Sequence, residues 1–419
     1  MTTVQTGRGP AYGHPALSRL VNLDPEKFAD TVWGREPLLS PAASLPASFE
    51  DLFSEDAVDE LVSSRGLRTP FLRVAKDGKT LPAAAFTAAG GAGAGVADQV
   101  SDDKLLRLFD DGATIVLQAL HRTWPPLAVF AQQLAAELGH PVQVNSYTTP
   151  PQHQGFSDHY DVHDVFVLQV CGEKTWRIRA PVHPVPLRDQ PWERRRLDVA
   201  QAALREPLIE ATLRPGDCLY LPRGYLHSAT ASGGGSTHLT IGVHVWTTHA
   251  VAEQLATQAL AALADRQDAR EALPLGIDVT DPAQLGTALA AAREALLGAL
   301  DALTADQLAA RMRTRSRDSQ RPAPIRPLAQ LRAAERLTPQ DSIAIRPYAA
   351  AHLEAAGDGW RVVSRVGQLA LDAADLPAVA AFLADGHARV ATTGMELARL
   401  LLRSGLAVLG RPDVTSSGA

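Results

Sequence analysis

The stretch that decides the fold is FSDHYDVHDVFVLQVCGEKTWRI, residues 156–178. Its almost unbroken apolar run, residues 165–170, predicts a strand. The alternating Thr-Trp-Arg-Ile-Arg that follows predicts a second strand, and the Cys-Gly-Glu-Lys segment between them predicts a short antiparallel connection. We therefore expect residues 165–179 to form a hairpin in an all-β core.

Two potential metal ligands precede this hairpin. His159 and Asp161 are two residues apart, and side chains at that spacing leave the same face of an extended chain. His227, within DCLYLPRGYLHSAT at 217–230, follows another predicted strand and offers a third ligand. Two imidazoles and one carboxylate leave coordination positions open and suit non-haem iron(II) oxygen chemistry. His163 extends the pattern and remains a rival ligand.

Three further polar residues predict a pocket for a small dicarboxylate. Lys174 lies on the second strand of the expected hairpin, and a buried ammonium is costly unless it meets an anion. Asn145 and Tyr147 share one face of the alternating stretch at 142–149, and both can donate hydrogen bonds to a carboxylate. The alternatives are a solvated turn for Lys174 and ordinary core packing for Tyr147. Five other histidines are expected to be surface or strand residues with local hydrogen bonds: His153, His183, His238, His244 and His249.

The pattern resembles the JmjC-type ribosomal oxygenases, which are cupin-fold hydroxylases of ribosomal-protein side chains that depend on iron(II) and 2-oxoglutarate. The similarity covers roughly residues 20–250. The motifs that carry it are NSYTTPP at 145–151, HYD at 159–161, GEKTW at 172–176, LPRGYLH at 221–227 and STHLTI at 236–241.

This resemblance implies a ligand set and a cosubstrate. Gly242 stands where relatives often carry a serine, which puts one cofactor contact in doubt, and Thr240 on the same face is a candidate replacement. By the resemblance, the iron ligands are His159, Asp161 and His227, and the 2-oxoglutarate contacts are Lys174, Asn145 and Tyr147.

The implied reaction is hydroxylation of a C–H bond while 2-oxoglutarate is converted to succinate. The protein contributes ligand geometry, a dry cavity and placement of the target carbon. A histidine or arginine of a ribosomal protein is the expected target. The alternatives are a 2-oxoglutarate-dependent hydroxylase of a peptide or amino acid in specialised metabolism, a JmjC-type lysine demethylase, and a metal-binding cupin that is not an oxygenase. A dicarboxylate pocket argues against the last.

Composition describes an intracellular protein of several domains. The chain has 419 residues, 46% of them hydrophobic, and a formal net charge of −6, which argues against generic nucleic-acid binding. Cys171 and Cys218 fall in predicted strands and are expected to be free core residues rather than a disulfide. No apolar run approaches a membrane span and no N-terminal apolar segment is found, so we expect a cytoplasmic location.

We expect an α+β protein whose first domain, residues 1–248, is a cupin or JmjC catalytic domain. Its core is a double-stranded β-helix, and a helical lead-in precedes it. The glycine- and alanine-rich stretch at 88–96 predicts a flexible loop. Lead-in helices are predicted after an N-cap Asp24, at 54–61, at 102–109 and at 125–138.

Two further domains are expected beyond the barrel. Alanine- and leucine-rich helices are predicted at about 250–265 and 281–312, and their apolar stripe fits an intramolecular bundle or a dimer interface. The resemblance makes residues 249–318 a helical dimerisation domain, so we expect a homodimer. A polar, proline-rich linker is predicted at 317–324. Residues 319–419 are expected to be winged-helix-like and, having few basic residues on the second helix, to bind protein rather than nucleic acid.

Overall fold

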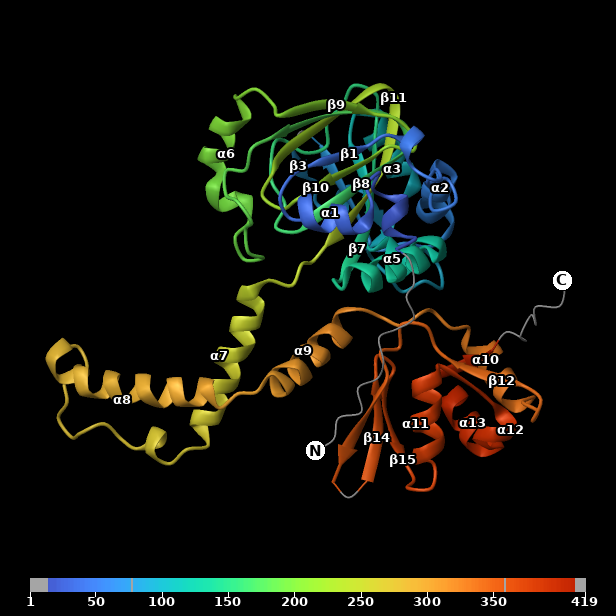
Figure 1. The fold of residues 1–419 in the computed structure, drawn as a ribbon. Coiled ribbons are helices and arrows are strands. Elements are labelled where there is room, and N and C mark those ends of the chain that lie inside the picture. The colour runs from blue at the N-terminus through green and yellow to red at the C-terminus, as the bar shows by residue number, and fades with distance from the viewer. Residues whose placement is uncertain (1–13, 77, 358, 411–419) are drawn as a thin grey trace. The chain divides into compact units, whose positions relative to one another are not determined.

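The computed structural model describes residues 14–76, 78–357 and 359–410 (Figure 1). The chain divides after Val245 into two compact units, each of which mixes helices and strands. An α+β protein was expected. The division into three domains stays a prediction. Among the described residues, no helix is long and apolar enough to cross a membrane.

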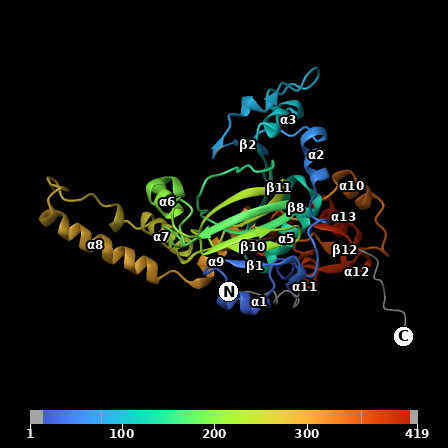
Figure 2. The same ribbon diagram turned by 90° about the horizontal axis from the view of Figure 1, so that it is seen from above.

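The first unit is built on one antiparallel nine-stranded sheet of the cupin type. Its strand order is β1-β10-β8-β11-β7-β6-β2-β3, and β9 pairs with β8 off this path. The strands β8, β10 and β11 run side by side at its centre (Figure 2). The strands are β1 (Leu38–Ser40), β2 (Leu72–Lys76), β3 (Lys79–Thr80), β6 (Thr114–Leu117), β7 (Val142–Thr149), β8 (Asp164–Arg179), β9 (Ile209–Leu213), β10 (Cys218–Leu221) and β11 (Leu226–Val243).

The expected hairpin at 165–179 is wrong, because β8 runs through this segment as one strand. Gly172, in the predicted turn, has a φ of +63° and lies where the pairing with β11 shifts register. Gly172 lies opposite residues 233–236 of β11, and the ladder skips Val170 between Cys171 and Gln169, so β8 is bulged here and bends without ending. Buried Gln169 donates through Nε2 to the carbonyl oxygens of Cys171 and Gly172, at 2.8 and 3.1 Å, so the interrupted ladder keeps hydrogen-bond partners.

The bulge reverses which face of the sheet successive side chains occupy. Before it, the odd-numbered Val165 and Val167 face a cavity inside the sheet; after it, the even-numbered Lys174 and Trp176 face the same cavity. Side chains of a regular strand alternate with a period of two, so one inserted residue exchanges the two faces. Lys174 therefore reaches the interior although its position differs from that of Asp161 by an odd number, 13.

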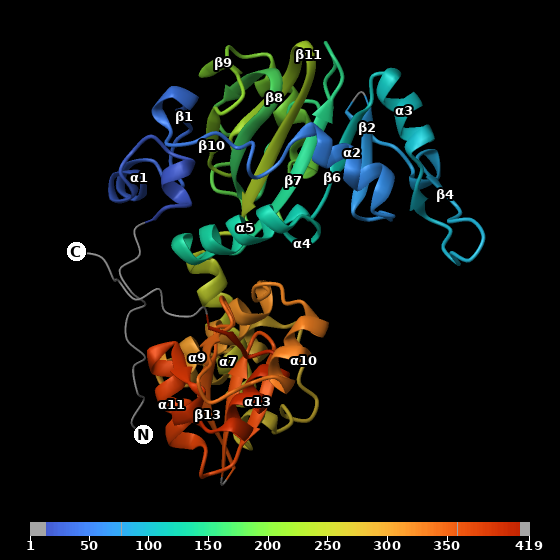
Figure 3. The ribbon, with the colours of Figure 1, turned by 90° about the vertical axis from the view of Figure 1, so that its right-hand side faces the viewer.

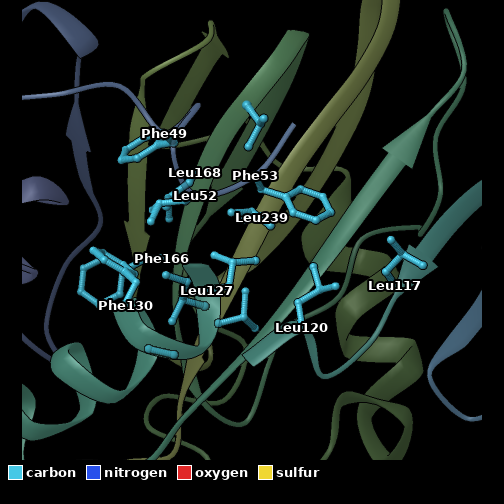
Figure 4. Close-up of a cluster of buried hydrophobic side chains, with 14 of the residues drawn as sticks. Phe49, Leu52, Phe53, Leu117, Leu120, Leu127, Phe130, Phe166, Leu168 and Leu239 are labelled. Atoms are coloured by element: carbon cyan, nitrogen blue, oxygen red, sulfur yellow. The ribbon is translucent and has the colours of Figure 1, made fainter. Parts of the chain in front are cut away.

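Helices cover the opposite face of β8. Figure 4 shows Phe166 and Leu168 of β8 among the helical side chains Leu127 and Phe130, and all four are buried. The first half of the strand is thus buried on both faces. Figure 3 shows two of the helices, α4 and α5, beside β7. The helices of this unit are α1 (Pro25–Thr31), α2 (Glu55–Ser64), α3 (Asp102–Asp110), α4 (Leu120–Thr123), α5 (Pro125–Leu138) and α6 (Arg196–Ala203).

The helices predicted before the barrel strands are present, and two of them begin at capping residues. Asp24 caps α1 by accepting hydrogen bonds from the N–H groups of Glu26 and Lys27, and Ser54 caps α2. The glycine-rich stretch at 88–96 forms the connection of a small hairpin. The strands of that hairpin are β4 (Thr87–Ala88) and β5 (Gln99–Val100).

The second unit begins with three helices that the sequence predicts as two. The stretch expected to be one helix at 281–312 is divided, because Thr304 and Gln307 form a capping box that starts a new helix. This last helix runs to Ser319, so the expected linker begins later than residue 317. The helices are α7 (Thr248–Ala264), α8 (Pro282–Asp301) and α9 (Ala305–Ser319).

The remainder of this unit has two three-stranded sheets and four helices around its own apolar core. The adjacent strands β14 and β15 form an antiparallel hairpin. Both cysteines of the chain are free, as expected. The elements are α10 (Pro327–Glu335), β12 (Ser342–Ile345), β13 (His352–Ala356), β14 (Gly359–Ser364), β15 (Gly367–Leu371), α11 (Leu376–Asp385), β16 (His387–Arg389), α12 (Val390–Thr393), α13 (Met395–Arg403) and β17 (Ala407–Leu409).

The bulge in β8 should tolerate only glycine at its centre. A Cβ on Gly172 would overlap the carbonyl oxygen of Gly235, and its positive φ is unfavourable for other residues. We expect Gly172→Ala to lower the free energy of unfolding by about 2 kcal/mol or more, measured by chemical denaturation. Gly234→Ala is the matched control, because a Cβ there meets nothing within 4 Å. Equal stability of the two variants would contradict the assignment of the bulge.

Candidate metal and oxoacid site

The three predicted metal ligands lie together in the first unit. One ligand atom from each of His159, Asp161 and His227 lies within 4.8 Å of the others, the only such group found among the described residues. His159 and His227 form an isolated antiparallel bridge, with N–H···O distances of 3.1 and 2.8 Å. The bridge brings the two imidazoles to a centroid separation of 4.4 Å. Two backbone hydrogen bonds thus join ligands that are distant in the sequence.

Backbone carbonyls orient both imidazoles. Nδ1 of His159 lies 2.7 Å from the carbonyl oxygen of Ser157, and Nδ1 of His227 lies 3.0 Å from that of Tyr225. A carbonyl only accepts, so each Nδ1 carries the proton and each Nε2 keeps its lone pair. Nε2 of His227 is 3.8 Å from Oδ2 of Asp161. Histidine ligands of metals are oriented in this way by their second nitrogen.

The protonation states also suit metal binding. Burial, with the nearby His159, lowers the pKa of His227 to about 4. Burial alone would raise the pKa of Asp161, but His163, His227 and His159 together outweigh it and hold the pKa below its ordinary value. A neutral imidazole and an ionised carboxylate are the ligand forms of these groups, so at neutral pH protons compete little with a metal.

A buried carboxylate fixes the loop that leads to His227. Asp164, fully buried, accepts hydrogen bonds from the hydroxyl of Tyr220 at 2.5 Å and from the backbone N–H of Arg223 at 3.2 Å. The guanidinium of Arg223 also pairs with it. Sequence reasoning missed Asp164, since its role depends on a partner strand far along the chain.

Lys174 lies in the same cavity as the three ligands. The cavity has a volume of about 430 Å³. Lys174 is only 4% exposed, and its Nζ donates to Oγ1 of Thr149 at 3.0 Å. Burial lowers its pKa to about 7. A buried ammonium beside a hydroxyl lacks the countercharge that would stabilise it, so this end of the cavity favours an anionic ligand.

The other two predicted cosubstrate contacts differ in position. Tyr147 lines the cavity; burial raises its pKa, although hydrogen bonds with Arg73 and Asn145 oppose the rise. Asn145 is absent from the cavity lining found among the described residues, and its Oδ1 accepts from the backbone N–H of Ala119 at 3.1 Å. The amide therefore contacts Tyr147 and the chain before α4.

Gly242 lies in a tightly packed part of β11. A Cβ on Gly242 would lie 3.1 Å from Cε1 of His163 and 3.2 Å from Cγ of Gln143, which is tight packing. Thr240, two residues earlier on β11, lines the cavity. The rival ligand His163 belongs to this neighbouring region, where its ring lies 5.4 Å from that of His244.

Two residues to which the sequence analysis gave no role in the site form part of the cavity wall. His238, expected to be a strand histidine with local hydrogen bonds, is buried and stacks on Tyr147 at 5.0 Å. Its Nδ1 has no hydrogen-bond partner among the described residues, and burial together with Lys174 holds its pKa well below the ordinary value. Arg73 of β2 also lines the cavity. Only the folded sheet brings β2 and β11 to one cavity.

The affinity for a metal should distinguish the predicted ligands from the rival His163. We expect His159→Ala and His227→Ala each to weaken cobalt(II) binding by about 100-fold or more, because each removes a coordinating atom. His163→Ala is the control and should stay within about twofold of the parent. The measurement is a titration followed by the cobalt absorption bands. Loss of binding in the control alone would identify His163 as the ligand.

The low pKa of Lys174 predicts a pH dependence for 2-oxoglutarate binding. Above pH 7 the amine of the empty site is neutral and must take up a proton to pair with a carboxylate. The affinity should then fall by about tenfold for each pH unit above 7, as measured by calorimetry between pH 6.5 and 8.5. The Lys174→Met variant should bind 2-oxoglutarate weakly at every pH, and its affinity should not fall as the pH rises. A flat profile in the parent protein would contradict the assignment.

Comparisons with known proteins agree with this geometry. A JmjC domain model matches residues 122–251. Ribosomal oxygenase 1 of Rattus norvegicus is 31% identical over 245 residues, which are 54% of this chain and 36% of that protein. The bifunctional lysine-specific demethylase and histidyl-hydroxylase NO66 of Drosophila persimilis is 41% identical over 104 residues, 25% of this chain and 14% of that protein. The chain thus spans about a third or less of the length of these relatives.

A solved structure shares the fold over most of the chain. The Escherichia coli ribosomal oxygenase YcfD in complex with cobalt and 2-oxoglutarate has a TM-score of 0.55 at 16% identity, covering 93% of this chain and 99% of that one. The motifs, the matched domain and the gathered ligands agree with one another. The chain therefore contains a region that matches the JmjC domain, and it is similar to the JmjC-type ribosomal oxygenases.

Proposed function

We propose that this protein is an iron(II)- and 2-oxoglutarate-dependent oxygenase that hydroxylates a side chain of a ribosomal protein. One observation carries the proposal: two oriented imidazoles and a carboxylate share a cavity with the buried Lys174, which pairs with no carboxylate among the described residues. A metal-binding cupin without oxygenase chemistry does not require a buried cation in this place. A redox metal beside an oxoacid site does.

In this proposal, His159, Asp161 and His227 hold the iron. Bound iron(II) supplies activation of dioxygen coupled to oxidative decarboxylation of 2-oxoglutarate. The carbonyls behind the two imidazoles keep Nε2 aimed at the metal, and the low pKa of His227 keeps it unprotonated. The ligand set leaves coordination positions for cosubstrate and oxygen.

Lys174, Tyr147 and Asn145 are proposed to hold 2-oxoglutarate. Lys174 supplies the charge for the distal carboxylate, and Thr149 orients its ammonium. Tyr147 lines the cavity and would offer the cosubstrate a hydrogen bond from its hydroxyl. Asn145 positions Tyr147 through their shared hydrogen bond. The apolar walls, Val165 and Val167 among them, exclude water and so strengthen these interactions.

A protein substrate agrees with the names of the relatives, which describe ribosomal oxygenases and a histidyl-hydroxylase. Exposed Glu193 and Arg196 stand at the cavity lining, so the site communicates with the surface and can admit a side chain from outside. Lysine demethylation, also named in a relative, is the second candidate. Arg73 and Arg196 on the cavity lining oppose a methylammonium group, whereas Glu193 on the same lining offers it a countercharge.

The helical segment is proposed to be a dimerisation domain. The helices α7 and α8 each have one buried residue, Ala259 and Ala299 respectively. The helix α9 has no buried residue. Leu289 and Leu297 of α8 are more than half exposed. Helices that bury so little are stabilised by covering an apolar face, and a second copy of the chain can supply that cover.

We also propose a division of the chain into three domains. The domains are residues 1–248, 249–318 and 319–419. The third is proposed to be winged-helix-like and to contact protein. A cytoplasmic location follows from a ribosomal-protein target.

The function can be tested by mass spectrometry of ribosomal proteins. Purified protein with iron(II), ascorbate and 2-oxoglutarate should form succinate and add the mass of one oxygen atom to one ribosomal protein. The Asp161→Ala variant should form both products at about 1% of the parental rate or less, because the loss of a metal ligand removes the metal. Fragmentation of the modified protein identifies the oxidised residue. Loss of a methyl group from lysine would instead support demethylation, and absence of both products with metal bound would contradict an oxygenase.

A further inference from the structure

The backbone pairing that joins the two imidazoles of the candidate metal site is very short. His159 lies in the irregular segment between β7 and β8, and it pairs with His227 through one isolated bridge of two hydrogen bonds. Two such bonds contribute only modestly to stability in water. Further contacts are therefore needed to hold the imidazoles at one separation.

The side chain of Asp158 makes a contact directly beside this bridge. The two segments run antiparallel here, so the residue before His159 lies opposite the residue after His227. That opposite residue is Ser228, and its hydroxyl donates to Oδ1 of Asp158 at 3.1 Å. The side chains of Asp158 and Ser228 thus continue the pairing beyond the backbone bridge.

A largely buried arginine provides the countercharge for Asp158. Nη1 of Arg179, the last residue of β8, donates to the same Oδ1 at 2.7 Å, and the side chains of Arg179 and Asp158 are only 11% and 25% exposed. Nε of Arg179 donates to the carbonyl oxygen of Arg205 at 2.8 Å, which orients the guanidinium. In the sheet, Arg179 pairs with Leu226, the residue before His227. A charge-assisted contact with so little exposure is weakened little by salt, so it can hold a defined geometry.

We propose that Asp158 is a positioning residue that fixes the separation of the two imidazole ligands by joining the His159 segment to β8 and β11. Asp158 is absent from the cavity lining found among the described residues, so it acts through the ligands rather than on a substrate. Groups behind metal ligands commonly set metal affinity in this way. The inference rests on the proposed function and assigns a role to a residue outside the ligand set.

The test is a cobalt(II) titration of the full-length protein, followed by the cobalt absorption bands. The unfolding temperature of the metal-free protein is measured in parallel. We expect Asp158→Ala to weaken cobalt(II) binding by about tenfold or more and to shift the bands, because the imidazoles lose their fixed separation. Asp158→Asn keeps an oxygen that accepts from Ser228 but loses the charge, so its affinity should lie between those of Asp158→Ala and the parent.

Two further variants test the ion pair. The variant that combines Arg179→Met with Asp158→Ala should bind cobalt(II) about as weakly as Asp158→Ala alone, because Arg179 acts through Asp158. Glu210→Ala is the matched control, since it removes the carboxylate that lies 3.1 Å from Arg177, another arginine of β8. That pair is exposed, and its loss should leave the cobalt(II) affinity within about twofold of the parent.

The outcomes separate a positioning role from a purely structural one. A lower unfolding temperature in Asp158→Ala with the parental affinity and bands would overturn the inference and leave the metal site intact. If Asp158→Ala does not fold, the same criterion applies to Asp158→Asn. Losses that multiply in the double variant would show that Arg179 and Asp158 act independently and would also overturn it. Failure of the parent to bind cobalt(II) would overturn the proposed metal site and this inference together.

Discussion

The site depends on one irregularity of the sheet, the bulge at Gly172 in β8. Without it, β8 would place either Val165 and Val167 or Lys174 and Trp176 inside, because alternation allows only one set. With it, the apolar wall and the buried ammonium belong to the same cavity. The strand is long enough to pair with β10 at one end and β9 at the other, so a single segment connects both ends of the site.

Burial acts on the charged groups of this cavity in different ways. It keeps His227 neutral, which is the form a metal requires. It also lowers the pKa of Lys174 to about 7, which makes the charged form costly until an anion arrives. Asp161 escapes the effect of burial because imidazoles surround it. The same low-polarity environment therefore prepares one end for a cation and the other for an anion.

The sequence predicts the parts of the site that short-range patterns determine. The strand at 142–149 and the helix at 125–138 match their observed bounds, since alternation, an N1 proline and a C-terminal glycine are local signals. His159, Asp161 and His227 were found because two share a strand face. The bulge was mistaken for a turn, because a glycine between apolar strands is common to both. Asp164, Arg73 and His238 act through partners on other strands, and no local pattern encodes such contacts.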